Sequence, residues 1–398
     1  MAVKLGNGNW AVKEDKLLAY NDNSGRFFNK EFDFARGSSA TYVGKDGLIK
    51  SAKSDVPRID FSDSTNGALL LEPIRTNLVT QSNNTTTNVW GHYNYGGGLI
   101  VDTYGYDSPD GKNEASRLVY TNSSAGSGGA LLTTNITLLA TGIYTISLWA
   151  KSVSGTKEIR FSPKSTSSSG TSGSKITLTN EWKRYTHTFT NDGGTSRGFQ
   201  FRISESEDSG DRTFDVWGMT IEEGSYATSY IPTQGSTVTR LADVCNNSGS
   251  AQDFNSEEGV LYAEIAALAD DLTNREITIS DGGAQNYVMI RFNSGNSNWI
   301  YTRVNLGVGY EYYNIDTNHI ITDFNKIALR FQDNNFATFI NGVKIKPQLS
   351  GNAFGVGVLN KISFAGGTGG QPFYGKTKNL QVFNYALTDE QLAALTTI

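Results

Sequence analysis

The stretch Tyr144-Thr145-Ile146-Ser147-Leu148-Trp149-Ala150-Lys151 alternates between two kinds of side chain. Every second residue is apolar: Tyr144, Ile146, Leu148 and Ala150. Successive side chains of a β-strand point to opposite faces of the sheet, so the stretch predicts a strand with one face in a core. The same period of two recurs across 159–161, 185–189 and 199–203.

Composition extends this prediction to the whole chain. The 398 residues include 43 Gly and only 7 Pro, with 20 Phe and 19 Tyr. Aromatic residues favour strands, while Gly and small polar residues favour the turns between them. The sequence therefore predicts an all-β protein with room for two or three domains.

Charge and cysteine content exclude several kinds of partner and of stabilisation. The net charge of −5 and the lack of a Lys/Arg-rich run exclude nucleic acid as a main partner, because phosphate binding needs a concentrated positive field. The one cysteine, Cys245, excludes an internal disulfide, so stability must come from packing and oligomerisation. Neither a signal peptide nor an apolar stretch of membrane-spanning length is found. We expect a soluble protein made in a cytoplasm, without membrane insertion.

Polar linkers divide the chain. Residues 81–88 (QSNNTTTN) and 246–252 (NNSGSAQ) separate runs of predicted strands. The predicted segments are an N-terminal arm or attachment segment at 1–30, a small β module at 31–80, a β-sandwich at 81–245 and a second sandwich at 246–398.

Two local motifs are specific. Asn341-Gly342 between apolar runs predicts a type I′ hairpin. Residues 387–395 predict a short C-terminal helix with Thr388 as N-cap and Gln391 completing a capping box.

No catalytic or metal motif accompanies these elements. The histidines at 92, 187 and 319 are far apart, and no nucleophile elbow, phosphate-binding loop or dinucleotide fingerprint occurs. Acidic residues cluster at Glu205, Glu207, Asp208 and Asp211. Their Ser and Gly neighbours favour a solvated loop over a catalytic pair, and a structural calcium there or at Asp215 is the alternative. No other cofactor is expected.

Exposed strand faces predict carbohydrate contacts. Sugars bind to aromatic faces flanked by planar polar side chains. In the middle region, alternation turns four such residues away from their apolar neighbours: Trp149, Arg160, Gln200 and Arg202. If their strands share a sheet, they form a binding platform. The alternative is a loop that covers Trp149 and arginines that pair with acids. Trp182 and Trp217 are assigned to the core.

A parallel pattern occurs in the C-terminal region. Two predicted strands together place three aromatic residues, a methionine and two arginines on one face: Tyr287, Met289 and Arg291, then Trp299, Tyr301 and Arg303. Their other faces, with Val288, Ile290, Phe292, Ile300 and Val304, are predicted to be core. The aromatic face fits a ligand or a symmetry mate equally well, since Arg and aromatic residues dominate both kinds of contact.

Four separated stretches together resemble structural proteins of tailed bacteriophages. They are 34–42 (FARGSSATY), 69–78 (LLLEPIRTNL), 217–233 (WGMTIEEGSYATSYIPT) and 239–243 (TRLAD). The resemblance implies a small N-terminal β module followed by carbohydrate-binding β-sandwiches.

Each predicted sandwich has its own resemblance. Residues 214–224 (FDVWGMTIEEG) and 181–185 (EWKRY) resemble strands of jelly-roll carbohydrate-binding modules of the CBM4/9 type. Residues 339–343 (FINGV), 375–383 (GKTKNLQVF) and 387–392 (LTDEQL) are similar to concanavalin A-like, laminin-G-type sandwiches. Some relatives of the latter fold hydrolyse glucans with an E-x-D-x-x-E strand, which is missing here.

These resemblances imply a non-enzymatic component of a phage virion, a head or tail fibre or a decoration protein. It would be synthesised in the host bacterial cytoplasm and reside on the virion surface. Its N-terminal part would attach to capsid or tail proteins, and its sandwiches would adhere to host or environmental polysaccharides, with the chain forming a homo-oligomer, as a trimer. The alternatives are a polysaccharide depolymerase or glycosidase, and a purely structural spacer.

Overall fold

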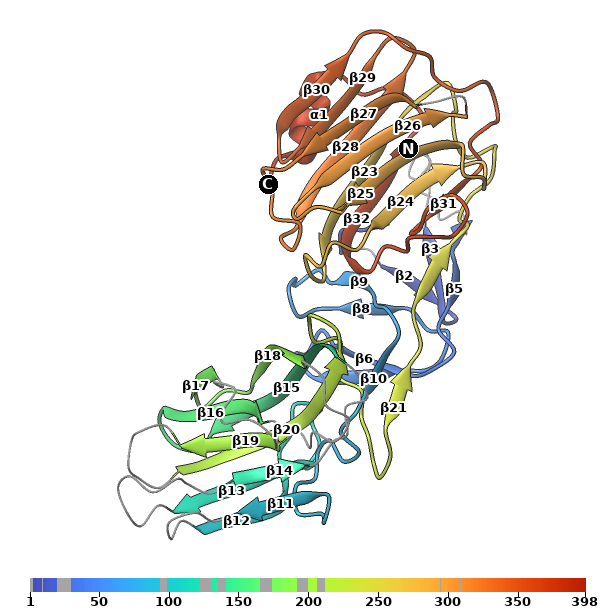
Figure 1. The fold of residues 1–398 in the computed structure, drawn as a ribbon. Helices are drawn as coiled ribbons and strands as arrows, with labels where there is room; N and C mark the ends of the chain where they lie inside the picture. The colour runs from blue at the N-terminus through green and yellow to red at the C-terminus, as the bar shows by residue number, and fades with distance from the viewer. Residues whose placement is uncertain are drawn as a thin grey trace. The chain divides into compact units, whose positions relative to one another are not determined.

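The computed structural model describes most of the chain. The described residues are 3–8, 10–19, 30–93, 99–121, 131–134, 141–164, 174–191, 200–205, 212–293, 295–307 and 310–398. Strands dominate these residues, which also include one short helix (Figure 1). The predicted all-β class is therefore confirmed.

The chain divides into two compact units. The first unit contains Met1–Gly47, Ser51–Pro73 and Leu241–Ile398, and the second contains Leu48–Lys50 and Ile74–Arg240.

An eight-stranded antiparallel sheet is the larger sheet of the first unit. Its strands are β1 (Val3–Gly6), β8 (Arg58–Asp60), β9 (Ala68–Leu71), β23 (Glu258–Ala267), β28 (Asn325–Gln332), β29 (Phe336–Ile340), β30 (Val343–Gln348) and β32 (Gly375–Phe383). They run in the order β30-β29-β28-β23-β32-β9-β8 (Figure 1). Strand β1 also pairs with β32.

A five-stranded sheet packs against it. Its strands are β24 (Arg275–Ser280), β25 (Asn286–Phe292), β26 (Ile300–Leu306), β27 (Tyr310–Asp316) and β31 (Lys361–Ser363), in the order β27-β26-β25-β24-β31. Alternate residues of both sheets form one buried cluster, as the period of two requires. The predicted core residues of β25 and β26 all belong to this cluster: Val288, Ile290, Phe292, Ile300 and Val304.

Both local motifs are confirmed. Asn341 and Gly342 connect β29 to β30 with φ values of 51° and 84°, as a type I′ turn requires. Helix α1 (Asp389–Thr396) has Thr388 as its N-cap, and both bonds of the capping box with Gln391 are present. The helix packs Leu392 against apolar residues on the outer face of the eight-stranded sheet.

The N-terminal strands are grouped differently from the predicted boundaries. Strand β1 pairs with β32, and its Val3 and Leu5 are fully buried. Strands β8 and β9 extend the same sheet. The predicted arm at 1–30 and module at 31–80 thus contribute strands to the C-terminal sandwich, and the boundaries at 30, 80 and 245 do not coincide with the units. Pairing between the two ends of a chain leaves no local pattern that reveals it.

Short strands complete this part of the chain. They are β2 (Ala11–Lys13), β3 (Lys16–Ala19), β4 (Lys30–Glu31), β5 (Asp33–Ala35), β6 (Ala40–Val43), β7 (Ile49–Ala52) and β22 (Val244–Asn246). Strands β2, β3 and β4 form one sheet, and β5 pairs with β22.

A buried ion network ties distant segments of the first unit together. Arg58 contacts Glu72 at 2.7 Å and Asp243 at 2.5 Å, and Arg36 contacts the other oxygen of Asp243 at 3.0 Å. All four residues are at most 2% exposed. Two positive and two negative charges balance, as burial of charge requires. The network joins three of the four stretches that resemble phage proteins.

The second unit is also a β-sandwich. Its strands are β10 (Arg75–Asn77), β11 (Trp90–Tyr93), β12 (Leu99–Tyr106), β13 (Ala115–Thr121), β14 (Leu131–Thr134), β15 (Gly142–Ser152), β16 (Lys157–Lys164), β17 (Ser174–Leu178), β18 (Lys183–Asn191), β19 (Gln200–Glu205), β20 (Arg212–Glu223) and β21 (Val238–Arg240). One sheet has the order β12-β13-β20-β15-β18 and another β17-β16-β19, while β11 pairs with β14 and β10 with β21. Ile146 and Leu148 of β15 share a core with Ile159 of β16.

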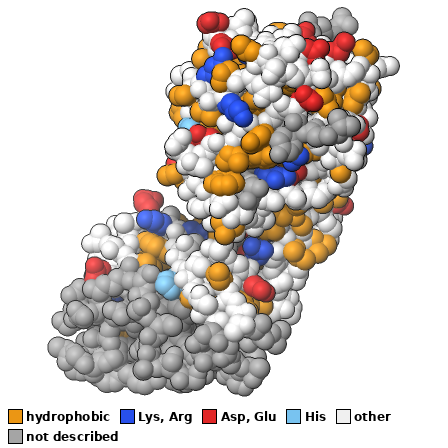
Figure 2. Space-filling view, turned by 45° about the horizontal axis from the view of Figure 1, so that its top comes forward, with side chains coloured by type: hydrophobic (Ala, Val, Ile, Leu, Met, Phe, Trp, Pro, Cys, Tyr) orange, Lys and Arg blue, Asp and Glu red, His pale blue; other side chains and the backbone are white. Residues whose placement is uncertain are grey.

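The surface is mixed in character. On the face in Figure 2, Lys/Arg and Asp/Glu side chains are interspersed with apolar ones, in keeping with the small net charge of −5. Among the described residues, no helix is both long and apolar enough to span a membrane.

Candidate functional site

The outer face of the five-stranded sheet carries most of the second predicted set of sugar-binding residues. Because the even-numbered side chains of β25 fill the core, Tyr287 and Arg291 lie on the opposite face. The register places Arg291 opposite Glu276 of β24 and opposite Tyr301 of β26. The predicted residues of two strands are therefore brought together on one surface.

Cation–π contacts hold the two arginines of this surface. The guanidinium of Arg291 lies 5.5 Å from the ring centre of Tyr301, and that of Arg303 lies 5.6 Å from the ring centre of Tyr287. Such contacts are favourable within about 6 Å of the ring centroid, more so when desolvated. The four side chains are partly buried, so each tyrosine positions an arginine before any ligand arrives.

Glu276 gives this surface a buried carboxylate. Its side chain forms an ion pair with Arg291, and the residue is only 5% exposed. Burial raises the pKa of Glu276 above its usual value, although the Arg291 guanidinium pulls that pKa down. Oε1, the oxygen in the ion pair, is buried and has no other hydrogen-bond donor among the described residues.

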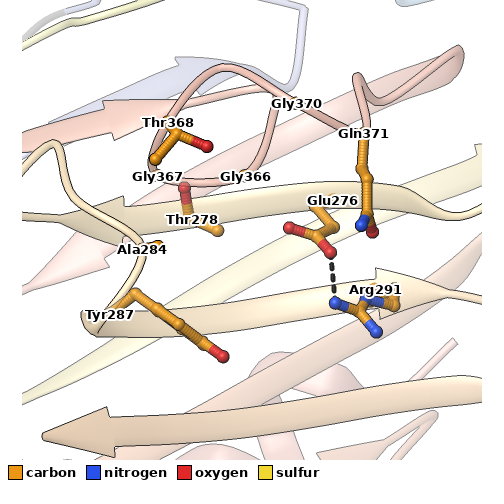
Figure 3. Close-up of a pocket in the computed structure, with 10 residues that line it drawn as sticks. All are labelled: Glu276, Thr278, Ala284, Tyr287, Arg291, Gly366, Gly367, Thr368, Gly370 and Gln371. Atoms are coloured by element: carbon orange, nitrogen blue, oxygen red, sulfur yellow. Dashed lines mark ion pairs between the residues drawn. The ribbon is translucent and has the colours of Figure 1, made fainter. Parts of the chain in front are cut away.

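A glycine-rich loop completes a small pocket over these residues (Figure 3). The pocket has a volume of about 180 Å³. Its lining combines β24, β25 and the loop: Glu276, Thr278, Ala284, Tyr287, Arg291, Gly366, Gly367, Thr368, Gly370 and Gln371.

Two of these glycines are required by close approach. A Cβ at Gly366 would lie 2.7 Å from Glu276 Oε2, and one at Gly367 would lie 2.2 Å from the carbonyl oxygen of Gly283. The Gly366 amide donates to the Gly370 carbonyl at 2.7 Å, which closes the loop. The Glu276 amide donates to the Gln371 carbonyl at 3.1 Å, which fixes the loop to β24. The backbone can approach the carboxylate only because side chains are missing there.

The pocket chemistry suits a polyhydroxylated ligand. The Glu276 carboxylate accepts hydrogen bonds and the Arg291 guanidinium donates them. The Gln371 amide and the threonine hydroxyls do both, and the ring of Tyr287 adds an apolar face. Its lining holds a single carboxylate, whereas glycoside hydrolysis uses a pair. The volume is below the range of about 300–1,000 Å³ for drug-sized ligands, so one sugar ring or a terminal group fits better than a chain.

The raised pKa of Glu276 predicts a pH dependence of stability. Between its ordinary value of 4.5 and its raised folded value, the folded protein binds more protons than the unfolded chain. The free energy of unfolding therefore falls as pH rises through that window. We expect Glu276→Gln to gain stability relative to the wild type as pH rises through the window, measured by urea unfolding across a pH series. The exposed Glu31→Gln is the control, and parallel wild-type and Glu276→Gln profiles would contradict the prediction.

Trp299 lies apart from this arrangement. It precedes β26, and its carbonyl accepts a hydrogen bond from the Asn293 amide at 2.7 Å. It is half-buried and does not line the pocket.

The first predicted platform is not assembled as one surface. In the second unit, Trp149 is on β15 of the sheet β12-β13-β20-β15-β18. Arg160 is on β16, and Gln200 and Arg202 are on β19, both strands of the separate sheet β17-β16-β19. The condition that these strands share a sheet is therefore not met. The side chains of Arg160, Gln200 and Arg202 lie outside the described residues.

Trp149 is instead packed among its neighbours. The Arg184 guanidinium lies 4.4 Å from its ring centre, and the rings of Trp217 and Tyr230 lie at 5.4 and 5.9 Å. Tyr230 follows β20 in the chain, so a segment covers this tryptophan as the alternative interpretation proposed. Trp217 is 1% exposed, as expected for core, while Trp182 is partly exposed and lies over Lys151.

The acidic residues considered for calcium differ in their surroundings. Asp215 is fully buried and accepts two hydrogen bonds from Arg117, at 2.7 and 3.0 Å. The side chains of the cluster at Glu205, Glu207, Asp208 and Asp211 lie outside the described residues. Among the residues that are described, no group of three or more His, Cys, Asp or Glu is placed to hold a metal.

Much of the second unit matches the model of a known family. Residues 77–210 match the family model described as a carbohydrate binding domain, CBM_4_9. This stretch, about a third of the chain, is thus a β-sandwich of carbohydrate-binding type, in agreement with the resemblance to CBM4/9 modules. No curated protein matches the sequence.

Solved structures give more distant likenesses. The CBM40 of the Ruminococcus gnavus IT-sialidase, bound to α2,3 sialyllactose, is 18% identical over 38% of this chain and 93% of its own, with a TM-score of 0.32. Domain 4 of a GH43 arabinanase from Geobacillus stearothermophilus, in complex with arabinotriose, is 14% identical over 44% of this chain and 83% of its own, at 0.32. Trypanosoma rangeli sialidase with the inhibitor DANA is 9% identical over 96% of this chain and 65% of its own, at 0.30.

Sequence reasoning missed most of the pocket. It named Tyr287 and Arg291, but not Glu276, Gln371 or the loop at 366–370. The run Gly-Gly-Thr-Gly-Gly at 366–370 was an available signal for close backbone approach. What lies under such a loop is decided by sheet pairing, which that run does not encode.

Proposed function

We propose that this chain is a non-enzymatic glycan-binding protein that acts on the surface of a phage particle. The pocket formed by Glu276, Arg291 and Tyr287 is the observation that carries the binding function. The match of residues 77–210 to a carbohydrate binding domain supports the same function in the second unit.

The binding mechanism follows from the geometry of the pocket. The ion pair places the Glu276 carboxylate and the Arg291 guanidinium side by side, so one accepts and the other donates to adjacent sugar hydroxyls. The cation–π contacts restrict both arginines, which lowers the entropy lost on binding. A pocket of about 180 Å³ binds weakly by itself, and display of several copies on one particle turns weak contacts into avidity.

Display on a virion rests on the resemblance of four stretches to phage structural proteins. The buried network of Arg36, Arg58, Glu72 and Asp243 supports this proposal, because its ion pairs connect three of those stretches in the fold. We propose a trimer that attaches to capsid or tail proteins through its N-terminal part. Light scattering of the purified chain tests the trimer, and antibody labelling of particles in negative stain tests the location.

Arg291 provides the test of binding. We expect Arg291→Ala to weaken binding to an immobilised glycan array by about tenfold or more, as for other central arginines of binding sites. The double variant Glu276→Gln/Arg291→Ala should bind equally poorly without leaving a buried carboxylate unpaired, which separates loss of ligand contacts from loss of folding.

The matched control is Lys344→Ala, a cation on the other sheet that pairs with Asp389. Unchanged binding by both Arg291 variants would place the function elsewhere. Release of reducing sugar from capsular polysaccharide would instead favour the depolymerase alternative, and failure of the chain to bind any glycan would favour the spacer.

A further inference from the structure

The second unit contains a larger cleft that none of the residues predicted from the sequence lines. Its volume is about 580 Å³. This lies within the range of about 300–1,000 Å³ that small-molecule sites occupy. Three segments distant in sequence form it: the polar stretch 81–84, Tyr104 with Lys112 and Glu114 near the β12–β13 turn, and residues 232–238.

Hydrogen bonds hold two of these walls in place. The Ser82 amide donates to the Thr233 carbonyl at 3.3 Å, and the Gly235 amide donates to the Thr80 carbonyl at 2.7 Å. The Thr233 hydroxyl donates to the Val79 carbonyl at 2.7 Å. The cleft is therefore shaped before a ligand binds, which reduces the cost of binding.

The charged side chains at the cleft pair with one another. Lys112 contacts Asp110 at 3.1 Å and Glu114 at 3.5 Å, and Nδ2 of the Asn83 side chain donates to Glu114 at 3.2 Å. Burial raises the pKa of the Tyr104 hydroxyl, Glu114 and Asp110 raise it further, and Lys112 lowers it. The two carboxylates of Asp110 and Glu114 face one ammonium, that of Lys112, so the local charge is negative, which disfavours an anionic ligand.

Neutral groups provide the contacts that remain. Tyr104 is 37% exposed, so part of its ring is open to a partner. The amide of Gln234 and the hydroxyl of Ser236 are on the exposed wall, and each both donates and accepts hydrogen bonds. An aromatic face beside such groups fits the apolar face and the hydroxyls of a sugar.

We propose that this cleft binds a neutral oligosaccharide, with a sugar ring stacked on Tyr104 and its hydroxyls bonded to Gln234 and Ser236. The inference rests on the proposed glycan-binding function and assigns a second site, separate from the Glu276–Arg291 pocket. The chain would then hold glycan at one site in each unit.

The experiment uses the full chain and a panel of three trisaccharides, cellotriose, maltotriose and trigalacturonate, titrated by ligand-observed NMR. We expect a neutral trisaccharide to bind, and Tyr104→Ala to weaken that binding by about tenfold or more. Tyr104→Phe should retain most of the affinity because it retains the ring. Ile143→Ala, another exposed side chain of the second unit at 48%, is the control.

Variants of the two sites distinguish this inference from the proposed function. Loss of neutral-sugar binding in Tyr104→Ala but not in Arg291→Ala supports the cleft. Equal affinity of Tyr104→Ala and the wild type, or a preference for trigalacturonate at this site, overturns it while the Arg291 pocket can still stand. Failure of the wild-type chain to bind any of the three overturns the proposal of a binding site at the cleft. Binding at the Glu276–Arg291 pocket is then tested by the glycan array.

Discussion

Asp243→Ala is expected to lower the free energy of unfolding of the first unit by about 3–5 kcal/mol, the loss typical of breaking a buried ion pair. Asp243 is 1% exposed and accepts from both Arg36 and Arg58. Its Oδ2 also accepts from the Glu72 amide at 2.8 Å. Removing it takes away one of the two carboxylates that pair with these buried guanidinium groups.

The size of this effect follows from desolvation. Burial lowers the pKa of the Arg58 guanidinium, and the Glu72 and Asp243 carboxylates outweigh that effect and raise it. Without Asp243 the arginines remain charged, because guanidinium does not deprotonate, and the interior must hold an excess of positive charge.

Urea unfolding gives the free energy, and hydrogen exchange locates the change. We expect faster exchange in β8, β9 and β22, the strands that adjoin the network. Glu31→Ala is the control, because Glu31 pairs with Lys16 at the surface, where ion pairs contribute about 0–1 kcal/mol. A loss for Asp243→Ala no larger than for Glu31→Ala would show that the network does not stabilise the unit.

Trp217→Ala is expected to destabilise the second unit by about 3–5 kcal/mol, as for other buried aromatic truncations. Trp217 is 1% exposed, and its ring centre lies 4.4 Å from that of Tyr230 and 5.4 Å from that of Trp149. Its removal opens a cavity that the rings cannot fill, since the pairing of β15 with β20 fixes Trp149 beside position 217.

Thermal and urea unfolding measure this loss, with Ile143→Ala as an exposed control expected to stay within about 0.5 kcal/mol. Trp149→Ala should cost less than Trp217→Ala, because Trp149 is partly exposed. The reverse order would mean that Trp149, not Trp217, is the main packing residue of this cluster.

The sequence predicted those features that arise from neighbours along the chain. Alternation predicted the core residues of β25 and β26, and Asn341-Gly342 predicted its hairpin, because positive φ at two successive residues is a local requirement. The capping box of α1 is likewise formed by residues three apart. Alternation also identified Tyr287 and Arg291 as members of one exposed face.

Alternation could not show what lies against that face. It treated Trp149 like Tyr287, because both are aromatic residues on the polar side of a strand. Trp149 is covered by Tyr230, whereas Tyr287 lines a pocket. The difference arises from two segments: the one after β20 covers Trp149, and the one before β32 forms the pocket beside Tyr287. The paths of both depend on the whole fold.

The all-β class, the turns, the terminal helix and the aromatic strand faces were thus determined by the sequence alone, since each depends on residues within a few positions of one another. Three features were decided only by the tertiary structure: the inclusion of β1, β8 and β9 in the C-terminal sandwich, the network around Asp243, and the loop that closes over Glu276. All three join segments far apart in the chain, and burial stabilises such contacts only once both partners have been folded together.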